Sequence, residues 1–336
     1  MQKRLGKQTV QLSAPAVIMA QAAVVGKKEG EGPLKNCFDY ISEDSYFGAN
    51  TWEKAETAML KRCFETLCDK ASLAPNQLDY VLSGDLLNQC VSSSFAMRDM
   101  GIPYFGLYGA CSTMAESLSL GAMLVDGGYA DRLCAITGSH FCSAERQFRF
   151  PLSYGGQRTP TSQWTVTASG GVILQSGGSG PAVTHITTGT VIDGGIADAN
   201  NMGAAMAPAA YDTISAHFAE TGRGPEYYDA IFTGDLGTVG HDILAELMKR
   251  DNIHLGVMYM DCGVLMFDEN AQDVHAGGSG CGCSASVLAG HIIPAMRKGI
   301  WNRVLFAATG ALMSPTTCQQ GDTISGICHA VAIENM

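Results

Sequence analysis

The apolar and polar residues of the chain alternate between two patterns. Short apolar runs typical of strands alternate with runs whose apolar residues recur every three or four positions, which is the helical period. The expected strands are 79–84, 132–138, 164–176, 229–233, 303–309 and 328–334, and the expected helices are 52–72, 88–99, 111–127, 204–221, 241–250 and 284–298. This alternation predicts an α/β architecture.

Three further stretches add to this picture. The apolar, aromatic run IPYFGLYGA at 102–110 predicts a buried strand, whereas 139–164 has no clear periodicity. The opening segment 1–28 has basic residues followed by an apolar stretch, as in a signal peptide, but glutamines and Ser13 interrupt it. We therefore expect an opening core strand and a protein that is not secreted. No segment has 18 uninterrupted apolar residues, so we expect no membrane-spanning helix.

The two halves of the chain repeat the same sequence features in the same order. DYVLSGDL at 79–86 matches DAIFTGDL at 229–236, and the Cys-Ser pair at 111–112, which precedes a Thr-Gly pair, matches the pair at 283–284. Ordered matches with conserved spacing indicate a duplication. We expect halves at 1–175 and 176–336, with the helices after the two cysteines facing each other and a ligand site between the halves.

Composition narrows the function classes. The formal net charge of −11 argues against a general nucleic-acid binder and requires local positive charge for any anionic ligand. The twelve cysteines are scattered along a long, core-rich chain, which indicates reduced thiols in a reducing compartment. Cys281 and Cys283 form the one close pair, but no further ligands stand at a matching spacing, so we expect no metal site.

Cys111 lies at a predicted strand-to-helix junction in the sequence GACSTMAES. There the free N–H groups and the helix dipole favour a thiolate, which is the setting of a nucleophile. A small buried cysteine in the core is the alternative, and the position alone leaves both open.

These residues resemble the thiolase and ketoacyl synthase superfamily. The resemblance rests on GACS at 109–112, on the duplication and on the glycine-rich run HAGGSGCGCSASVLAG at 275–290. It implies a thiolase-like fold, with two duplicated α/β halves in five α-β-α-β-α layers. Nearly the whole chain is similar to one branch, the stage V sporulation protein AD family, including DSYFGANTWEKAE at 44–56 and AAMAPAAYDTI at 204–214.

By this resemblance Cys111 matches the acyl-accepting cysteine of the superfamily. The second catalytic position, a histidine in synthases, falls on Gly234 or Asp235, and the third, an Asn or His, falls on Cys281. Losing one oxyanion donor typically costs a condensing reaction roughly a hundred- to a thousand-fold. The chain thus keeps the nucleophile position without its partners, although His241 remains a candidate substitute and His275 a candidate site-lining residue.

The sporulation branch implies a binding function. Its members are expected to bind dipicolinic acid, pyridine-2,6-dicarboxylate, alone or as its calcium chelate, in the pocket that synthases use for catalysis. The protein would be a cytoplasmic, peripheral subunit of a channel complex at the forespore or spore inner membrane, and a homodimer, with no cofactor. The alternatives are an acyl-transferring or condensing enzyme that uses Cys111 and an acyl-CoA thioester, and a structural subunit with a vestigial pocket.

A planar dianion calls for arginine and for amide donors. Arg146, Arg149 and Arg158 lie in a charge-poor segment and are candidate ligands, although each can equally face solvent or form an ordinary salt bridge. Backbone N–H groups of the glycine-rich loop, at Gly280 and Gly282, are candidates for an anion cradle, with a plain tight turn as the alternative. Cys281 is expected to line the pocket.

The aspartates of the two GDL motifs are expected to be structural. A carboxylate just after a strand can accept hydrogen bonds from the first N–H groups of the next helix, so Asp85 and Asp235 are assigned capping roles. Met206 is expected to belong to a packing face of a helix.

Overall fold

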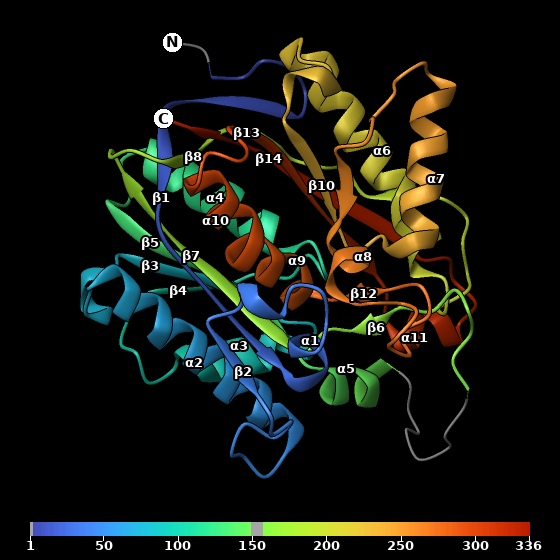
Figure 1. Ribbon diagram of the computed structural model, residues 1–336, viewed down its shortest axis with the longest axis horizontal. Coiled ribbons are helices and arrows are strands. Elements are labelled where there is room, and N and C mark those ends of the chain that lie inside the picture. Colours follow the sequence, from blue (N-terminus) through green and yellow to red (C-terminus); the bar gives the residue numbers. More distant parts are fainter. Residues whose placement is uncertain (1–2, 149–156) are drawn as a thin grey trace.

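The computed structural model describes residues 3–148 and 157–336, and most of its β-strands form one twelve-stranded sheet (Figure 1). Ten of these strands form two five-stranded halves, and two short strands pair beside them. The first half has the order β4 (Tyr104–Gly106), β3 (Tyr80–Gly84), β5 (Arg132–Ser139), β7 (Ala168–Ser176) and β1 (Thr9–Gly26). The second half has the order β11 (Tyr259–Asp261), β10 (Ala230–Gly234), β13 (Arg303–Leu312), β14 (Ser325–Asn335) and β8 (Pro181–Thr187). Pairing between β1 and β8 joins the halves.

The strand directions confirm the duplication. In the first half β3 pairs parallel with β4 and β5, while β7 pairs antiparallel with β5 and β1. In the second half β10 pairs parallel with β11 and β13, while β14 pairs antiparallel with β13 and β8. Each strand of one half thus has a counterpart in the other. The boundary near residue 175 stays a prediction.

Helices complete five layers. The outer face of the first half carries α2 (Trp52–Ala71) and α3 (Val91–Met97), and that of the second half carries α6 (Met202–Thr221) and α7 (Gly237–Arg250) (Figure 1). Between the halves lie α4 (Thr113–Asp126), α9 (Cys281–Val287) and α10 (Ile293–Arg297), with the π-helical turn Leu288–Ile292 joining the last two. The helix that follows Cys111 (α4) and the helix that contains Cys283 (α9) therefore face each other, as expected.

Shorter elements complete the chain. They are α1 (Lys27–Gly30), β2 (Tyr40–Ser42), α5 (Phe141–Phe148), β6 (Trp164–Thr165), β9 (Ile192–Asp193), α8 (Cys262–Met266), β12 (Gly278–Ser279), α11 (Pro315–Gln319) and the 3₁₀ turns Lys35–Cys37, Pro75–Gln77, Asn88–Cys90 and Pro225–Tyr227.

The core follows the layers. One large apolar cluster fills the space between the halves around α4 and α9, and two smaller clusters lie under the outer helices. A Cβ added to Gly170 of β7 would lie 2.2 Å from the backbone of Ala285, so α9 packs directly on the strand. Met206 is buried in the cluster under α6, which confirms its packing role.

Three predictions about individual segments have different outcomes. The opening segment forms β1, an interior strand between β7 and β8, as predicted. The run 102–110 is not a buried strand: only 104–106 is a strand, it is the last one of its half, and Phe105 is 47% exposed because β4 has a neighbour on one side only. Within the segment without clear periodicity, Phe141–Phe148 forms the helix α5.

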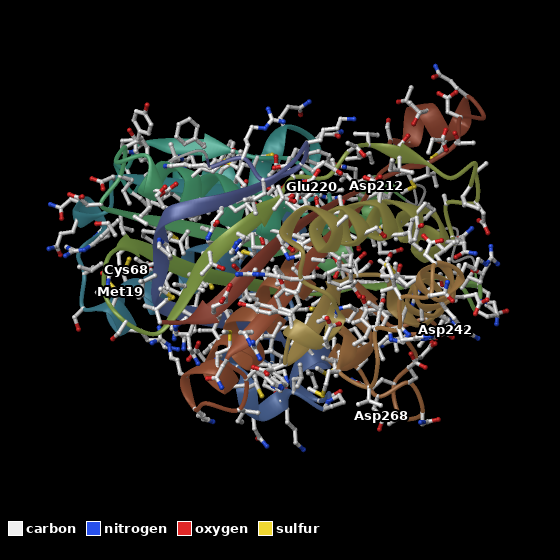
Figure 2. The ribbon with its side chains drawn as sticks, turned by 90° about the horizontal axis from the view of Figure 1, so that it is seen from above. Met19, Cys68, Asp212, Glu220, Asp242 and Asp268 are labelled. Atoms are coloured by element: carbon white, nitrogen blue, oxygen red, sulfur yellow. The ribbon has the colours of Figure 1, made fainter. Side chains whose placement is uncertain are left out.

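Residues of α6 hold the first residues of the chain in place. The Glu220 carboxylate accepts hydrogen bonds from the N–H groups of Lys7, Gln8 and Thr9. Asp212, on the same side of α6, accepts one from the Gln8 side chain (Figure 2). Within the described residues, no helix is long and apolar enough to span a bilayer.

Candidate functional site

Cys111 lies in a tight turn between β4 and α4. Ala110 adopts a positive φ of 50°, and the Ser112 and Thr113 side chains donate hydrogen bonds to the carbonyls of Gly109 (2.7 Å) and Ala110 (2.6 Å). A Cβ on Gly310 of β13 would lie 2.3 Å from the Gly109 carbonyl oxygen. The turn is therefore fixed by its own hydroxyls and pressed against the second half of the molecule.

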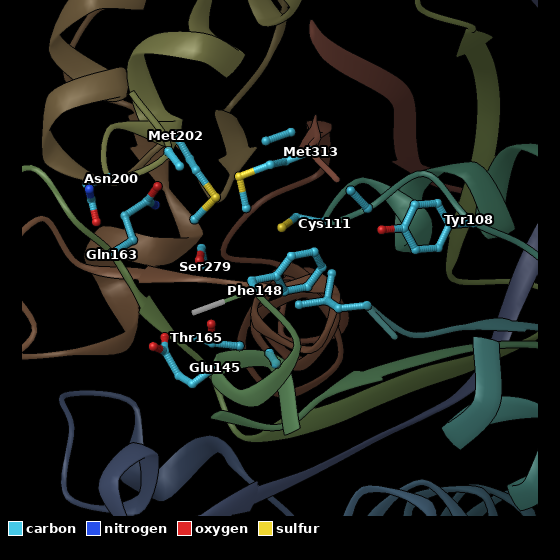
Figure 3. Close-up of a pocket in the computed structure, with 15 residues that line it drawn as sticks. Tyr108, Cys111, Glu145, Phe148, Gln163, Thr165, Asn200, Met202, Ser279 and Met313 are labelled. Atoms are coloured by element: carbon cyan, nitrogen blue, oxygen red, sulfur yellow. The ribbon is translucent and has the colours of Figure 1, made fainter. Parts of the chain in front are cut away.

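The Cys111 thiol faces a cavity of about 260 Å³ built from both halves (Figure 3). Tyr108, Phe148, Met202 and Met313 surround it with aromatic rings and thioethers. The complete lining is Leu86, Tyr108, Ala110, Cys111, Ala144, Glu145, Phe148, Gln163, Thr165, Ala199, Asn200, Met202, Ser279, Ala311 and Met313. Cys283, the counterpart of Cys111 in the second half, is fully buried and does not belong to this lining.

The glycine-rich loop passes beside Cys111 but uses its N–H groups within the protein. The Gly280 N–H donates to Asp235 Oδ2 (3.1 Å), and the Gly282 N–H donates to Ser139 Oγ (3.1 Å). A Cβ on Gly282 would lie 2.1 Å from the Ala168 carbonyl oxygen. The glycines therefore permit close packing of this loop on the first half, and the geometry does not support the anion cradle expected of them.

Cys281 is fixed behind the cavity. Its thiol donates to the Gly138 carbonyl (3.0 Å), and its own carbonyl accepts from the Thr137 hydroxyl (2.7 Å). It packs with Cys111 in a small apolar cluster that also contains Leu86. The structure thus brings Cys281 next to Cys111 but leaves it out of the cavity lining, in contrast to the expectation that it lines the pocket.

The two GDL aspartates have different roles. Asp85 accepts hydrogen bonds from the N–H groups of Leu87 (2.8 Å) and Ser93 (2.7 Å), which confirms its capping role. The capping role predicted for Asp235 is wrong. Asp261 instead accepts from the first N–H groups of α7, and Asp235 Oδ2 accepts from the Gly280 N–H.

The electrostatics at Cys111 oppose a thiolate. Burial, and then the Asp235 carboxyl, raise the pKa of the Cys111 thiol well above its usual value. Burial and the neighbouring Asp261 likewise raise the pKa of Asp235. Both effects, burial first, act against the thiolate that the helix dipole would favour.

The predicted cationic ligands within the described residues lie outside the cavity lining. Arg146 forms an ion pair with Glu53, and the Arg158 guanidinium lies 4.9 Å from the centre of the Trp164 ring. His275 lies 3.4 Å from the Asp273 carboxylate, and Arg149 is outside the described residues. None of the three described side chains lines the cavity, and in the described lining Glu145 is the one charged residue.

His241, the candidate substitute for the missing histidine, is on α7 and stacks on Tyr259 at 4.3 Å between ring centres. It lies outside the cavity lining. No three His, Cys, Asp or Glu side chains in 3–148 and 157–336 form a group able to hold a metal ion.

Most of the polar lining was not found from the sequence. Gln163 donates from Nε2 to the carbonyls of Asp235 (2.7 Å) and Gly278 (2.9 Å), while its Oε1 has no hydrogen-bond partner among the described residues. Asn200 and Ser279 come from two other distant segments. Tyr108 is the one lining residue here that the sequence could have indicated, because it lies in the aromatic run just before GACS.

Comparisons with known proteins agree with this geometry. In solved structures the chain is similar to 3-oxoacyl-[acyl-carrier-protein] synthase III from Aquifex aeolicus VF5, with a TM-score of 0.57, 13% identity, and coverage of 95% of this chain and 99% of the other. It is also similar to a single-residue variant of OleA from Xanthomonas campestris, with a TM-score of 0.61, 11% identity, and coverage of 96% and 99%. At these identities the likeness shows the fold, which is thiolase-like.

The sequence comparisons are more specific. Stage V sporulation protein AD from Bacillus subtilis (strain 168) is 42% identical over 332 residues, which are 99% of this chain and 98% of that protein. The family model of stage V sporulation protein AD matches residues 6–334. This chain, with its thiolase-like fold, belongs to the stage V sporulation protein AD family.

Proposed function

We propose that this sporulation protein binds dipicolinic acid in the Cys111 cavity and does not catalyse acyl transfer. The observation that carries the proposal is the buried Asp235 carboxyl, which helps to raise the pKa of the Cys111 thiol. The superfamily resemblance expects a histidine at Gly234 or Asp235 instead. A carboxyl group there replaces the imidazole that would donate to the carbonyl oxyanion, and its charge when ionised opposes both an oxyanion and a thiolate. The cavity is then free to serve as a binding site.

The size and the lining of the cavity support a small aromatic ligand. About 260 Å³ lies below the roughly 300–1,000 Å³ typical of drug-sized ligands, so the cavity suits one ring better than a long acyl chain. Met202, Met313 and Phe148 offer thioether and ring contacts to a planar ring. Asn200, Ser279 and Thr165 offer polar contacts to its substituents.

The lining of the cavity favours the calcium chelate over the free dianion. The chelate of one calcium ion with one dipicolinate carries no net charge, so it loses less hydration than the dianion on entering a cavity lined largely by apolar side chains. We therefore expect this protein to bind the chelate more tightly than the free acid.

The family also supports a peripheral role. We place the protein at the forespore or spore inner membrane, on the cytoplasmic side, as a subunit of a channel complex that moves dipicolinic acid. We further place a homodimer contact at β4, the edge strand of the first half. Phe105 in this strand, Tyr108 just after it and Phe95 close by in the chain are 43–50% exposed.

Thermal unfolding in the presence of ligand tests the proposal. Calcium dipicolinate should raise the melting temperature of the protein by at least about 3 °C, because it binds the folded state alone. Benzene-1,3-dicarboxylate, which has the same two carboxyl groups but no ring nitrogen, should not. Ala199→Trp, which fills the cavity, should abolish the shift, whereas Ala219→Trp on the exposed face of α6 should retain it. Equal melting temperatures with and without ligand would exclude binding.

Acyl transfer is the second candidate, favoured by the position of Cys111 in the cavity just before α4. It predicts a covalent acyl adduct on Cys111 after incubation with a short-chain acyl-CoA. We expect the intact mass of the protein to stay unchanged, because the thiol stays protonated and is a poor nucleophile.

A further inference from the structure

One wall of the cavity is a two-stranded ribbon that takes one strand from each half of the chain. β6 pairs parallel with β12, and Thr165 lies opposite Ser279 in the register. Because successive side chains of a strand point to opposite faces, residues that lie opposite each other share a face. Both residues line the cavity, and they are 8% and 2% exposed (Figure 3). Two hydroxyl groups therefore face the cavity side by side, on strands about 4.8 Å apart.

Neither hydroxyl group has a hydrogen-bond partner among the described residues. The carbonyl groups of Gly277, Gly278 and Ser279 accept hydrogen bonds of 2.8–2.9 Å from other donors. The Thr165 methyl group faces Gly280, because a Cβ added there would lie 3.6 Å from it, and this leaves the hydroxyl to the cavity side. A buried hydroxyl group without a partner is unfavourable, so two of them on one wall indicate an acceptor that a ligand supplies.

The other N–H and O–H donors of the described lining are used within the protein or belong to a more exposed side chain. Gln163 Nε2 donates to two backbone carbonyl groups, and Asn200 Nδ2 donates to Asp198 Oδ1 (3.3 Å). Tyr108 is 43% exposed. Within the described lining, the buried hydroxyl groups left to a ligand are therefore those of Thr165 and Ser279.

We propose that the Thr165 and Ser279 hydroxyl groups together receive a carboxylate of the ligand, and that this pair makes the cavity selective for single-ring aromatic carboxylates as a class. A carboxylate is an acceptor with several lone pairs, so both hydroxyl groups can donate to it at once. Hydrogen bonds to an ionised acceptor are about twice as strong as those to a neutral one. In a calcium chelate, the carboxylate oxygens that do not touch the ion remain available. This inference rests on the proposed function, because it takes the cavity as a binding site.

Selectivity between two ligands of the same shape tests this role. Benzoate and nitrobenzene are both planar and similar in size, but the nitro group is uncharged and a weak acceptor. A ligand-observed NMR titration of the full-length protein gives the affinity of each. Thr165→Val, which removes a hydroxyl group at nearly constant volume, and Ser279→Ala should each weaken benzoate binding about five-fold or more. Both variants should leave nitrobenzene binding within about two-fold of that of the unmodified protein.

Two further variants separate this role from a loss of packing. Thr165→Ser keeps the hydroxyl group and should retain benzoate binding. Met202→Leu changes the lining without removing a hydroxyl group, so any change in affinity should be the same for the two ligands. The proposal is overturned if Thr165→Val and Ser279→Ala weaken the binding of both ligands equally, or if they leave benzoate binding unchanged.

Titration of the same samples with calcium dipicolinate distinguishes failure of this inference from failure of the proposed function. If benzoate binding depends on both hydroxyl groups but calcium dipicolinate does not bind, the ligand assignment fails and the role of the pair stands. If calcium dipicolinate binds equally well to the unmodified protein and to both variants, the role of the pair fails and the proposed function stands. If the unmodified protein binds neither benzoate nor calcium dipicolinate, both are overturned.

Discussion

Asp261 holds together the elements next to Asp235 in the second half of the molecule. Its buried carboxylate accepts hydrogen bonds from the N–H groups of Leu236 and Gly237 at the start of α7 and of Gly263 in α8. The Thr233 hydroxyl of β10 donates to it as well (2.8 Å). One side chain therefore fixes the ends of two helices and a strand directly beside Asp235.

Asp261→Ala should lower the free energy of unfolding by about 3 kcal/mol or more, because it leaves several buried N–H groups without an acceptor. Urea denaturation measures this. Asp268→Ala is the matched control, since Asp268 is exposed and accepts from the Asn270 N–H, and it should cost no more than about 1 kcal/mol. Equal losses in the two variants would contradict the role given to Asp261.

At this scale the sequence predicted the central cysteine but not its surroundings. Cys111 was identifiable because it lies at a strand-to-helix junction next to a recognisable motif. Asp85 and Asp235 occupy the same motif yet differ, because Asp261 takes over the capping in the second half, and no local pattern signals that. The prediction of Arg146 as a ligand rests on its charge alone. Its guanidinium instead pairs with Glu53, which is ninety-three residues away in the chain, so the local sequence does not indicate where it lies.

Among the elements, α1 connects the segment ahead of β7 to the loop just before the glycine-rich run. Glu29 Oε1 accepts from the Thr167 N–H (2.9 Å), and Lys28 Nζ lies 3.7 Å from the centre of the Trp164 ring. The Gln272 side chain donates to the Lys28 carbonyl (2.7 Å). Because Glu29 is 1% exposed, burial raises its pKa to about 7.

This shift makes the stability contribution of Glu29 depend on pH. The folded state holds the Glu29 proton up to about pH 7 and the unfolded state only to about 4.5, so the folded state binds more protons between these values. The contribution is fully present below about pH 4.5 and is lost as the pH rises through 7, by about 3 kcal/mol in total.

Glu29→Gln removes the titrating group. The free energy of unfolding of this variant, relative to that of the unmodified protein, should therefore rise by about 3 kcal/mol between pH 4.5 and pH 8. Urea denaturation of both proteins at several pH values measures the difference in their free energies of unfolding. The contributions of the other titrating groups cancel in this difference. Glu31→Gln, at an exposed position on the same turn, should run parallel to the unmodified protein. A parallel curve for Glu29→Gln would contradict the assignment.

Long elements with a clear period were predicted well, and short ones were not. The helix expected at 52–72 and the strand expected at 132–138 differ from α2 and β5 by one residue at an end. α5 has eight residues, too few for a helical period to show, and tertiary contacts such as the stacking of Phe141 on Trp164 (3.8 Å) stabilise it.

For the whole molecule, the duplication provides two equivalent cysteine positions, of which Cys111 and not Cys283 lines the cavity in the described residues. The halves repeat strand for strand, yet the cavity forms on the Cys111 side, where Met202 and Met313 approach from the second half. The repeat was legible in the sequence because its spacing is conserved. The exposure of β4 could not be predicted from the sequence. The order of the strands, and not local hydrophobicity, determines which strand lies at the edge of a sheet.

The exposed edge predicts the behaviour of the molecule in solution. Phe105→Asp should convert a dimer into a monomer, because a charge on the edge strand opposes strand pairing between two copies. Sedimentation velocity measures the mass. Val257→Asp, at a residue that is 95% exposed in the other half, should leave the dimer intact. A monomeric unmodified protein would contradict the proposed contact.

The measurement that tests the central claim most directly is a calorimetric titration of the protein with dipicolinic acid, with and without calcium, alongside Cys111→Ala. We predict saturable binding at one site per chain, tighter with calcium and weakened about five-fold or more by the substitution, which removes the thiol from the cavity wall. An absence of binding heat under both conditions, at several temperatures, would contradict the claim that this cavity binds dipicolinic acid.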